Sequence, residues 1–226
     1  HYPLRRQRQM CIRDSYATKK PFGLKGDFIT APQISKLFSE IIAIWIVSTW
    51  QIFGNPKKFN IVELGPGDGS LMKTLLETFK RFPDFNKAKT IYLYEVSNFL
   101  KGIQKKNIKN KKVKWIKNFQ HMNSGPVIFF GNEFFDAIPI KQFKRKKDLM
   151  FEKYFTFNEN NKITEIFKKA AEKDISIINS YKSLINLKFI EFPKFGLEEL
   201  KKIVNRISKK EGCLLMIDYG LSLIHI

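Results

Sequence analysis

Cysteine and histidine are scarce in this chain of 226 residues, which contains two Cys and three His. Outside residues 1–15 and 221–226 only Cys213 and His121 remain. One cysteine cannot form an internal disulfide, and two side chains cannot supply the three or four ligands of a zinc site. A G-x-S-x-G element, which marks many serine hydrolases, is also missing. We therefore expect neither a disulfide framework, nor a bound metal, nor a serine hydrolase.

Long apolar runs are missing as well. The longest, Ile41 to Val47, is far shorter than the roughly 20 residues of a membrane-spanning helix. No segment has the layout of a secretory signal peptide. Hydrophobic residues make up 43% of the chain and aromatic residues 14%, enough to fill a substantial core. We expect a globular protein that does not insert into a membrane.

Arginine is rare and unevenly placed, although the formal net charge is +20. Lys and Arg number 41, and only seven of these are Arg. Nucleic-acid sites favour the bidentate contacts of Arg, and the densest basic run, Lys101 to Lys117, lacks the interleaved aromatic residues of a base-stacking surface. We therefore interpret the lysines as a solvated surface and expect no nucleic-acid partner.

The two ends differ in composition from the rest of the chain. Four of the seven Arg lie within the first 13 residues, which contain no Lys. The segments 8–15 (RQMCIRDS) and 221–226 (LSLIHI) resemble translated adapter sequence. We predict that residues 1–15 and 221–226 are non-native and exclude them from functional reasoning. The alternative for the first segment is a basic N-terminal arm.

Strands and helices are predicted to alternate along the remaining chain. A long apolar helix follows Pro32 and ends before Asn55-Pro56, and an exposed β-hairpin is expected at about 149–168. Short, continuously apolar strands that alternate with helices are typical of a parallel sheet covered by helices. The predicted strands are 60–64, 90–96, 112–116, 126–130 and 213–219, and the other predicted helices are 70–82, 98–107 and 197–208. The fold class is therefore α/β, with a Rossmann-like sheet.

A glycine-rich turn follows the first strand, in the sequence Glu63-Leu64-Gly65-Pro66-Gly67-Asp68-Gly69. A strand that enters such a turn and then a helix gathers backbone N–H groups at one crevice. Gly65, Gly67 and Gly69 lack the Cβ that would keep a ligand away from the backbone. Glu63 would repel a pyrophosphate and suits a ligand with a cationic amino-acid end, such as S-adenosylmethionine. A plain turn without a ligand is the alternative.

Two further acidic segments are predicted at the same edge of the sheet. Glu95, at the end of the second strand, is placed to accept hydrogen bonds from ribose hydroxyls; otherwise it is an exposed carboxylate. The loop after the fourth strand contains Asn132, Glu133 and Asp136. Asn132 is a candidate for cofactor binding, and the two acids are candidates for pairing with a cationic substrate such as a guanidinium. Helix capping by Asp136 is the alternative, and Asp218 joins the same edge.

Several of these segments together resemble the MidA family of class I methyltransferase-like proteins. They are GDFITAPQIS (26–35), VELGPGDGSLM (62–72), YEVS (94–97), NEFFDAIPIKQF (132–143) and IDYG (217–220). The resemblance covers about residues 16–220. It implies binding of S-adenosylmethionine, a loop containing Gly26, Asp27 and Thr30 that closes over the cofactor, and, for mitochondrial members, arginine methylation of a complex I subunit.

The resemblance also bears on domain organisation and location. Family members begin before Tyr16 and continue beyond the IDYG segment, so we expect residues 16–220 to form a partial methyltransferase domain whose sheet is truncated after the fifth strand. The expected location is the cytoplasm of a bacterium, or the mitochondrial matrix in a eukaryote.

Protein arginine methylation, catalysed with Glu133 and Asp136, is the leading function from the sequence. A non-catalytic S-adenosylmethionine-binding assembly chaperone is the first alternative, and a nucleic-acid methyltransferase is the second. The latter lacks an N/D-P-P-Y/F motif, and nothing in the sequence predicts the oligomeric state.

Overall fold

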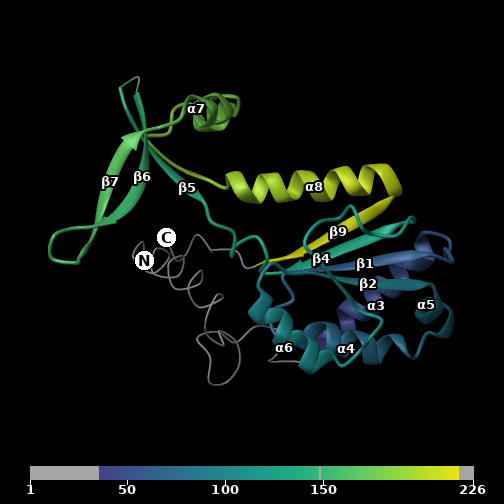
Figure 1. Cartoon of the computed structure of the whole chain (residues 1–226). Coiled ribbons are helices and arrows are strands. Elements are labelled where there is room, and N and C mark those ends of the chain that lie inside the picture. Colours follow the sequence, from purple (N-terminus) through teal and green to yellow (C-terminus); the bar gives the residue numbers. More distant parts are fainter. Residues whose placement is uncertain (1–35, 148, 219–226) are drawn as a thin grey trace. The chain divides into compact units, whose positions relative to one another are not determined.

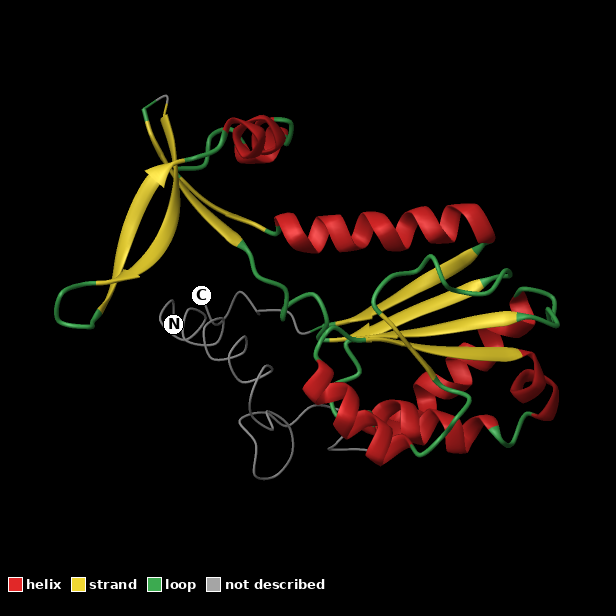
Figure 2. Cartoon of the chain, viewed as in Figure 1, coloured by secondary structure: helices red, strands yellow, loops and turns green. Residues whose placement is uncertain are grey.

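A computed structural model describes residues 36–147 and 149–218 of the chain (Figures 1 and 2). These residues divide into two compact units. The first unit contains residues 36–137 and 201–218, and the second contains Ile138–Leu200. The predicted terminal extensions and the loop with Gly26, Asp27 and Thr30 lie outside the described residues.

The first unit contains a five-stranded sheet in the order β3-β2-β1-β4-β9. All of its neighbouring strands run parallel, as the sequence predicts. All six residues of β1 are buried, including the polar residues Asn60 and Glu63 among its apolar ones. The strands are β1 (Phe59–Leu64), β2 (Lys89–Tyr94), β3 (Lys114–Ile116), β4 (Val127–Asn132) and β9 (Gly212–Ile217).

Helices cover both faces of this sheet (Figure 2). On one face, α3 (Lys36–Ile52), α4 (Ser70–Phe79) and α5 (Pro83–Ala88) pack in one hydrophobic cluster with alternate residues of β1, β2 and β4. On the other face, Ile203 and Ile207 from the C-terminal part of α8 (Lys194–Lys210) pack against Val62, Leu64 and Phe129. The remaining helix, α6 (Asn98–Ile108), follows β2. Successive side chains of each strand point to opposite faces of the sheet, so the strand register determines which face each side chain reaches.

Most element boundaries differ by a few residues from the sequence prediction, and two of these differences bear on the candidate site. The predicted helix 70–82 ends at Phe79, because Pro83 starts a separate short helix, α5, where its missing N–H costs no hydrogen bond. The second strand ends at Tyr94, so Glu95 lies directly after β2 rather than within it. None of the helices in the described ranges is long and apolar enough to span a lipid bilayer.

The second unit contains a four-stranded antiparallel sheet in the order β7-β6-β5-β8. β6 (Leu149–Phe157) and β7 (Ile163–Lys169) form the hairpin predicted at 149–168. The sequence prediction missed the other elements of this unit, which are β5 (Lys141–Lys146), α7 (Glu172–Asn179), a short 3₁₀ helix η1 (Lys182–Leu184) and β8 (Phe189–Phe192). The hairpin is therefore part of a larger sheet with its own core.

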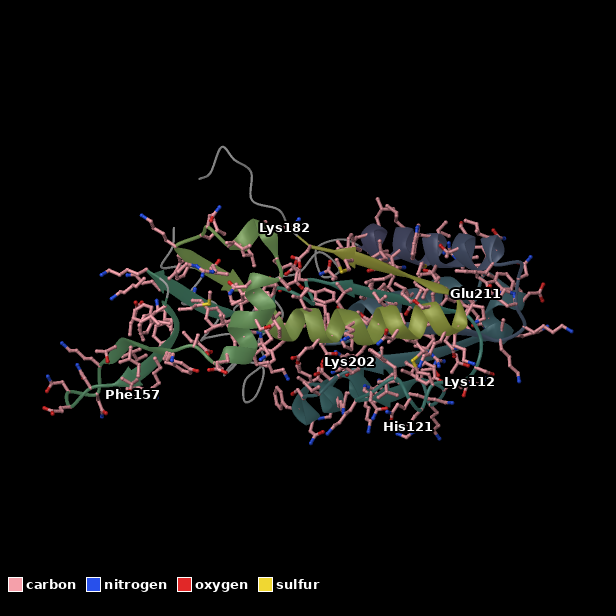
Figure 3. The ribbon with its side chains drawn as sticks, turned by 90° about the horizontal axis from the view of Figure 1, so that it is seen from above. Lys112, His121, Phe157, Lys182, Lys202 and Glu211 are labelled. Carbon is pink, nitrogen blue, oxygen red and sulfur yellow. The ribbon has the colours of Figure 1, made fainter. Side chains whose placement is uncertain are left out.

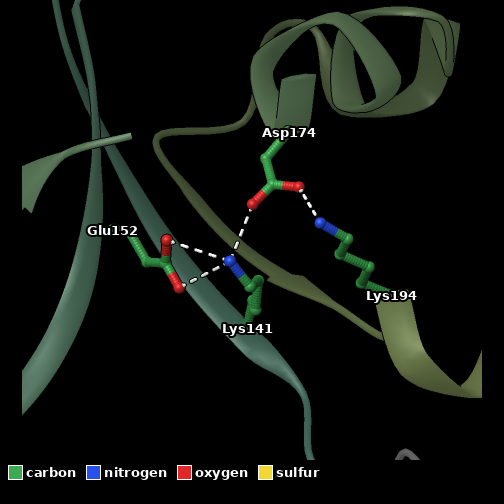
Figure 4. A network of polar contacts seen from close by, with 4 residues as sticks. All are labelled: Lys141, Glu152, Asp174 and Lys194. Carbon is green, nitrogen blue, oxygen red and sulfur yellow. Dashed lines mark hydrogen bonds and ion pairs between the residues drawn. The ribbon is translucent and has the colours of Figure 1, made fainter. Parts of the chain in front are cut away.

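Four charged side chains link the strands and helices of the second unit (Figure 4). Lys141 lies 2.7 Å from Oδ2 of Asp174 and 2.9 Å from Oε1 of Glu152. Lys194 contacts the other oxygen of Asp174 at 2.5 Å. Although burial alone would raise the pKa of Asp174, hydrogen bonds from the two lysines lower it below its ordinary value. Because Asp174 is buried, this pairing is needed to keep its charge in the interior.

Candidate cofactor site

The glycine turn between β1 and α4 is held in a conformation that favours glycine. Gly65, Gly67 and Gly69 have φ values of 60°, 55° and 83°. Oδ1 of Asp68 accepts a hydrogen bond from the backbone N–H of Ser70 at 2.9 Å and so stabilises the start of α4. Contacts between neighbouring residues therefore stabilise the conformation of the turn.

Two of the three glycines make room for side chains of the same chain. A Cβ on Gly65 would lie 2.9 Å from the ring of Phe134, and one on Gly69 would lie 3.0 Å from Ile108. The glycine pattern in the sequence predicts that the missing Cβ atoms let a ligand approach the backbone. The structure adds a packing reason, which applies whether or not a ligand is bound.

Glu63 is the buried acid of the site. Its side chain is at the end of β1, the residue is 3% exposed, and Oε2 has no hydrogen-bond partner among the described residues. Burial, with smaller contributions from Asp68 and Glu95, raises its pKa to about 8. A buried carboxyl oxygen without a partner suits a hydrogen-bond donor or an ammonium group on a ligand.

Glu95 is held by contacts on both carboxylate oxygens. Oε1 accepts from the N–H of Ser97 at 2.8 Å, and Oε2 accepts from the amide of Gln104 at 3.0 Å. The same Gln104 amide donates to the carbonyl of Gly67 at 2.8 Å, and its oxygen accepts from Nε1 of Trp115 at 2.9 Å. Burial raises the pKa of Glu95, and these hydrogen bonds oppose the rise. Gln104 therefore connects the glycine turn to the second predicted acid.

The loop after β4 lies beside the glycine turn. Asn132 ends β4, and the N–H of Glu133 donates to the carbonyl of Ile217 at 2.8 Å. Glu133 has a φ of 55°, an uncommon conformation for a residue with a side chain. Phe134 packs against both Gly65 and Tyr94. The contact between Phe134 and Gly65 brings Asn132 and Glu133 to the carboxyl edge of the sheet, and Asp136 follows on the same half-buried loop.

The structure thus places most of the predicted site residues at one edge of the sheet. The three glycines form the turn after Glu63, and Gln104 links this turn to Glu95. The 132–136 segment lies next to the turn. Among the described residues, no group of three His, Cys, Asp or Glu side chains is arranged to hold a metal ion. Gln104 was missed from the sequence, although a polar residue between Leu100 and Ile108 interrupts an apolar stripe at helical spacing.

Residues 41–224 match a protein family described as "Putative S-adenosyl-L-methionine-dependent methyltransferase". The chain belongs to this family. This description confirms the methyltransferase family and the cofactor that the sequence predicts. The parallel five-stranded sheet with helices on both faces confirms the α/β fold class.

Two curated relatives of the chain are named as mitochondrial protein arginine methyltransferases. The chain is 30% identical to "Protein arginine methyltransferase NDUFAF7 homolog, mitochondrial" of Caenorhabditis elegans, over 89% of the chain and 52% of the relative. It is 26% identical to human "Protein arginine methyltransferase NDUFAF7, mitochondrial", over 91% of the chain and 52% of the relative. The chain therefore spans about half the length of the curated relatives it matches.

Two solved structures share the fold. A COG1565 superfamily member from Burkholderia thailandensis bound to S-adenosyl-homocysteine superposes with a TM-score of 0.66, at 18% identity over 89% of this chain and 52% of that one. A native structure of a COG1565 superfamily protein from the same organism gives a TM-score of 0.67, at 16% identity over 97% of this chain and 60% of that one.

The polar groups of this candidate site fit S-adenosylmethionine. Oε2 of Glu63, which lacks a hydrogen-bond partner in the described part of the chain, matches the cationic amino-acid end, and Glu95 supplies carboxylate oxygens for hydroxyl groups. The backbone of the glycine turn offers N–H groups at the start of α4.

Proposed function

We propose that this protein transfers a methyl group from S-adenosylmethionine to a protein side-chain nitrogen, with arginine as the acceptor. The observation that carries the proposal is the arrangement of the buried Glu63, the glycine turn and Glu95 around one carboxyl edge. The names of the curated relatives support arginine as the acceptor.

The cofactor would supply an activated methyl group, and the residues of the chain would supply binding and orientation. Glu63 would hold the amino-acid end of the cofactor. Glu95, positioned by Gln104, would hold the ribose hydroxyls. Asn132, next to the turn, is the further candidate for a cofactor contact, and the Gly26, Asp27 and Thr30 segment is proposed to cover it. Methyl transfer is a displacement in line with the leaving group, so positioning supplies much of the catalysis.

Glu133 and Asp136 are proposed to bind the acceptor guanidinium. Carboxylates form charge-assisted, bidentate hydrogen bonds with a guanidinium and so fix the direction of its attacking nitrogen. The short loop between Asn132 and Asp136 would keep both acids close to the cofactor, because the Phe134–Gly65 contact fixes the loop against the turn.

A subunit of respiratory complex I is the proposed protein substrate, following the family resemblance. The curated relatives are named mitochondrial, so the mitochondrial matrix is the proposed location in a eukaryote and the cytoplasm in a bacterium. The comparisons favour neither the assembly chaperone nor the nucleic-acid methyltransferase.

Calorimetric titration with S-adenosyl-homocysteine tests the cofactor site. We expect saturable binding that is lost in Gly67→Val, because a branched side chain at φ 55° strains the turn, and no binding of NADH. A folded Gly67→Val variant that binds as tightly as the wild type would contradict the proposed site. Transfer of labelled methyl groups to an arginine-containing protein then separates an enzyme from a chaperone, since a chaperone would bind without transfer.

A further inference from the structure

A second concave site lies in the first unit, apart from the cofactor residues. It is a cleft of about 730 Å³ between α4, α6, the start of β2 and the turn that leads into β3. This volume is in the range of small-molecule sites. Glu63, Glu95 and the three glycines do not line it. The seven lysines that line it are Lys73, Lys80, Lys89, Lys106, Lys109, Lys111 and Lys112.

The positive charge of this cleft is almost uncompensated. Glu77 is its only carboxylate, and none of the seven lysines forms an ion pair with any residue in the described ranges 36–147 and 149–218. Folding brings together lysines from separate parts of the sequence, namely α4, the start of β2 and the run after Lys101. Like charges gathered in a concave site repel one another and concentrate anions there.

Lys89 is the least solvated of these lysines. It is half-buried, and its ammonium donates to the carbonyl oxygen of Asn86 at 3.2 Å and also to the Asn86 side-chain oxygen. Burial, together with the nearby charge of Lys112, lowers its pKa to about 8. A bound anion would favour the charged form of Lys89 and relieve its repulsion from Lys112.

The turn after α6 presents its lysines from an ordered backbone. Lys109 ends the helix with a φ of 49°. Asn110 accepts hydrogen bonds from the N–H of Lys112 through its side chain, at 2.9 Å, and from the N–H of Val113 through its carbonyl, at 3.3 Å. Figure 3 shows Lys112 toward the same end of the first unit as Glu211, which directly precedes β9. Because the hydrogen bonds of Asn110 already order the turn, less conformational entropy is lost when a ligand binds.

The chemistry of the lining selects the class of anion. Leu76, Ile91, Ile108 and Val113 provide apolar surface, and no described lining residue is aromatic or Arg. Base stacking on aromatic rings, on which single-stranded nucleic-acid sites depend, is therefore unsupported. Lysines bind phosphate groups as point charges, and apolar surface suits an uncharged portion of the ligand. We infer that this cleft binds a small phosphate ester that carries two or more phosphate groups and an uncharged portion.

Binding of ATP and of inorganic tripolyphosphate to the whole chain, by calorimetry, tests the inference. We expect one saturable site for ATP, with affinity reduced at least about tenfold in the Lys89→Gln/Lys112→Gln variant. Tripolyphosphate should compete with ATP and bind more weakly, because it lacks an uncharged portion to contact the apolar lining. The charge-matched control is Lys182→Gln/Lys209→Gln, because both residues are exposed and lie outside the cleft. It should bind ATP within about twofold of the wild type.

Three results would overturn the inference. The first is an absence of saturable ATP binding by the folded chain. The second is an equal loss of ATP affinity in the control, which would indicate diffuse attraction by the net charge. The third is saturable, cleft-dependent binding of single-stranded RNA or of an acidic peptide without binding of ATP, which would make the partner a polymer. If Lys89→Gln does not fold, the exposed pair Lys106→Gln/Lys111→Gln replaces it with the same expectation.

Discussion

The amide nitrogen of Gln104 donates to Glu95 at 3.0 Å and to the carbonyl of Gly67 at 2.8 Å, so one buried side chain fixes two parts of the candidate cofactor site. Its amide oxygen is also used, by Nε1 of Trp115. A glutamine that satisfies its hydrogen bonds in this way sets the distance between the glycine turn and the acid after β2.

Gln104→Leu should therefore weaken cofactor binding. The substitution leaves the Gly67 carbonyl, the Glu95 oxygen and the Trp115 N–H without this partner, which should lower the free energy of unfolding by about 2–3 kcal/mol. Affinity for S-adenosyl-homocysteine, measured by calorimetry, should fall about tenfold. Gln120→Leu, at an exposed position, is the matched control and should change neither quantity. Wild-type affinity in a folded Gln104→Leu variant would show that the connection does not position the site.

Glu63 should make the stability of the chain depend on pH. Its pKa in the folded state, about 8, lies above the ordinary value of 4.5. Between these values the folded state binds more protons than the unfolded state, so the contribution of Glu63 to stability is complete below pH 4.5 and is lost as the pH rises toward 8. Glu63→Gln removes this loss, because the amide does not ionise.

Urea unfolding of both chains at pH 5 and pH 8 measures this effect. Relative to wild type, Glu63→Gln should be more stable at pH 8 than at pH 5, by on the order of 3–4 kcal/mol. Glu77→Gln, at an exposed position of α4, controls for the loss of one negative charge. The same stability difference at both pH values would rule out a buried, neutral Glu63.

Gly65 should tolerate no side chain. Gly65→Ala places a Cβ 2.9 Å from the Phe134 ring at a φ of 60°, which should cost about 2–3 kcal/mol of stability. Gly102→Ala is the matched control, because nothing lies within 4 Å of its Cβ position in the middle of α6. The control should stabilise the chain by about 0.5–1 kcal/mol.

A double-mutant cycle identifies the cause of the Gly65 effect. Phe134→Ala removes the ring that a Cβ at position 65 would meet, so Gly65→Ala should cost less in that background. The remaining cost measures the backbone conformation alone. Additive effects of the two substitutions in thermal unfolding would exclude a contact between residues 65 and 134.

The parallel sheet and its carboxyl edge were predictable from the sequence because continuous apolar strands and a glycine turn are local signals. Glu63 and Glu95 were found for the same reason, since each lies at or directly after the end of such a strand.

Gln104 was missed because its role depends on contacts with residues 9 and 37 positions away. The cleft lysines were interpreted as a solvated surface, because the sequence does not reveal that α4 and the 109–113 turn face one space. Strands β5 and β8 were missed because β5 is charged and β8 has only four residues.

The charge network of the second unit should be essential for its stability. Asp174 is buried and pairs with Lys141 and Lys194 (Figure 4). Asp174→Asn would leave two ammonium groups without this carboxylate, which should destabilise the chain by about 2–3 kcal/mol. Glu40→Gln is the control for a partly exposed ion pair, since Glu40 pairs with Lys36 on α3, and should cost at most about 1 kcal/mol.

The pH dependence of wild type and Asp174→Asn distinguishes a charge effect from a packing effect. Because the pKa of Asp174 is lowered in the folded state, its contribution is present above its ordinary value of 3.8 and is lost as the pH falls below it. The stability difference between the two chains, from urea unfolding, should therefore be constant from pH 7 to pH 5 and shrink below pH 4. A difference that does not change down to pH 3 would assign the cost to packing and would contradict the role of the ion pairs.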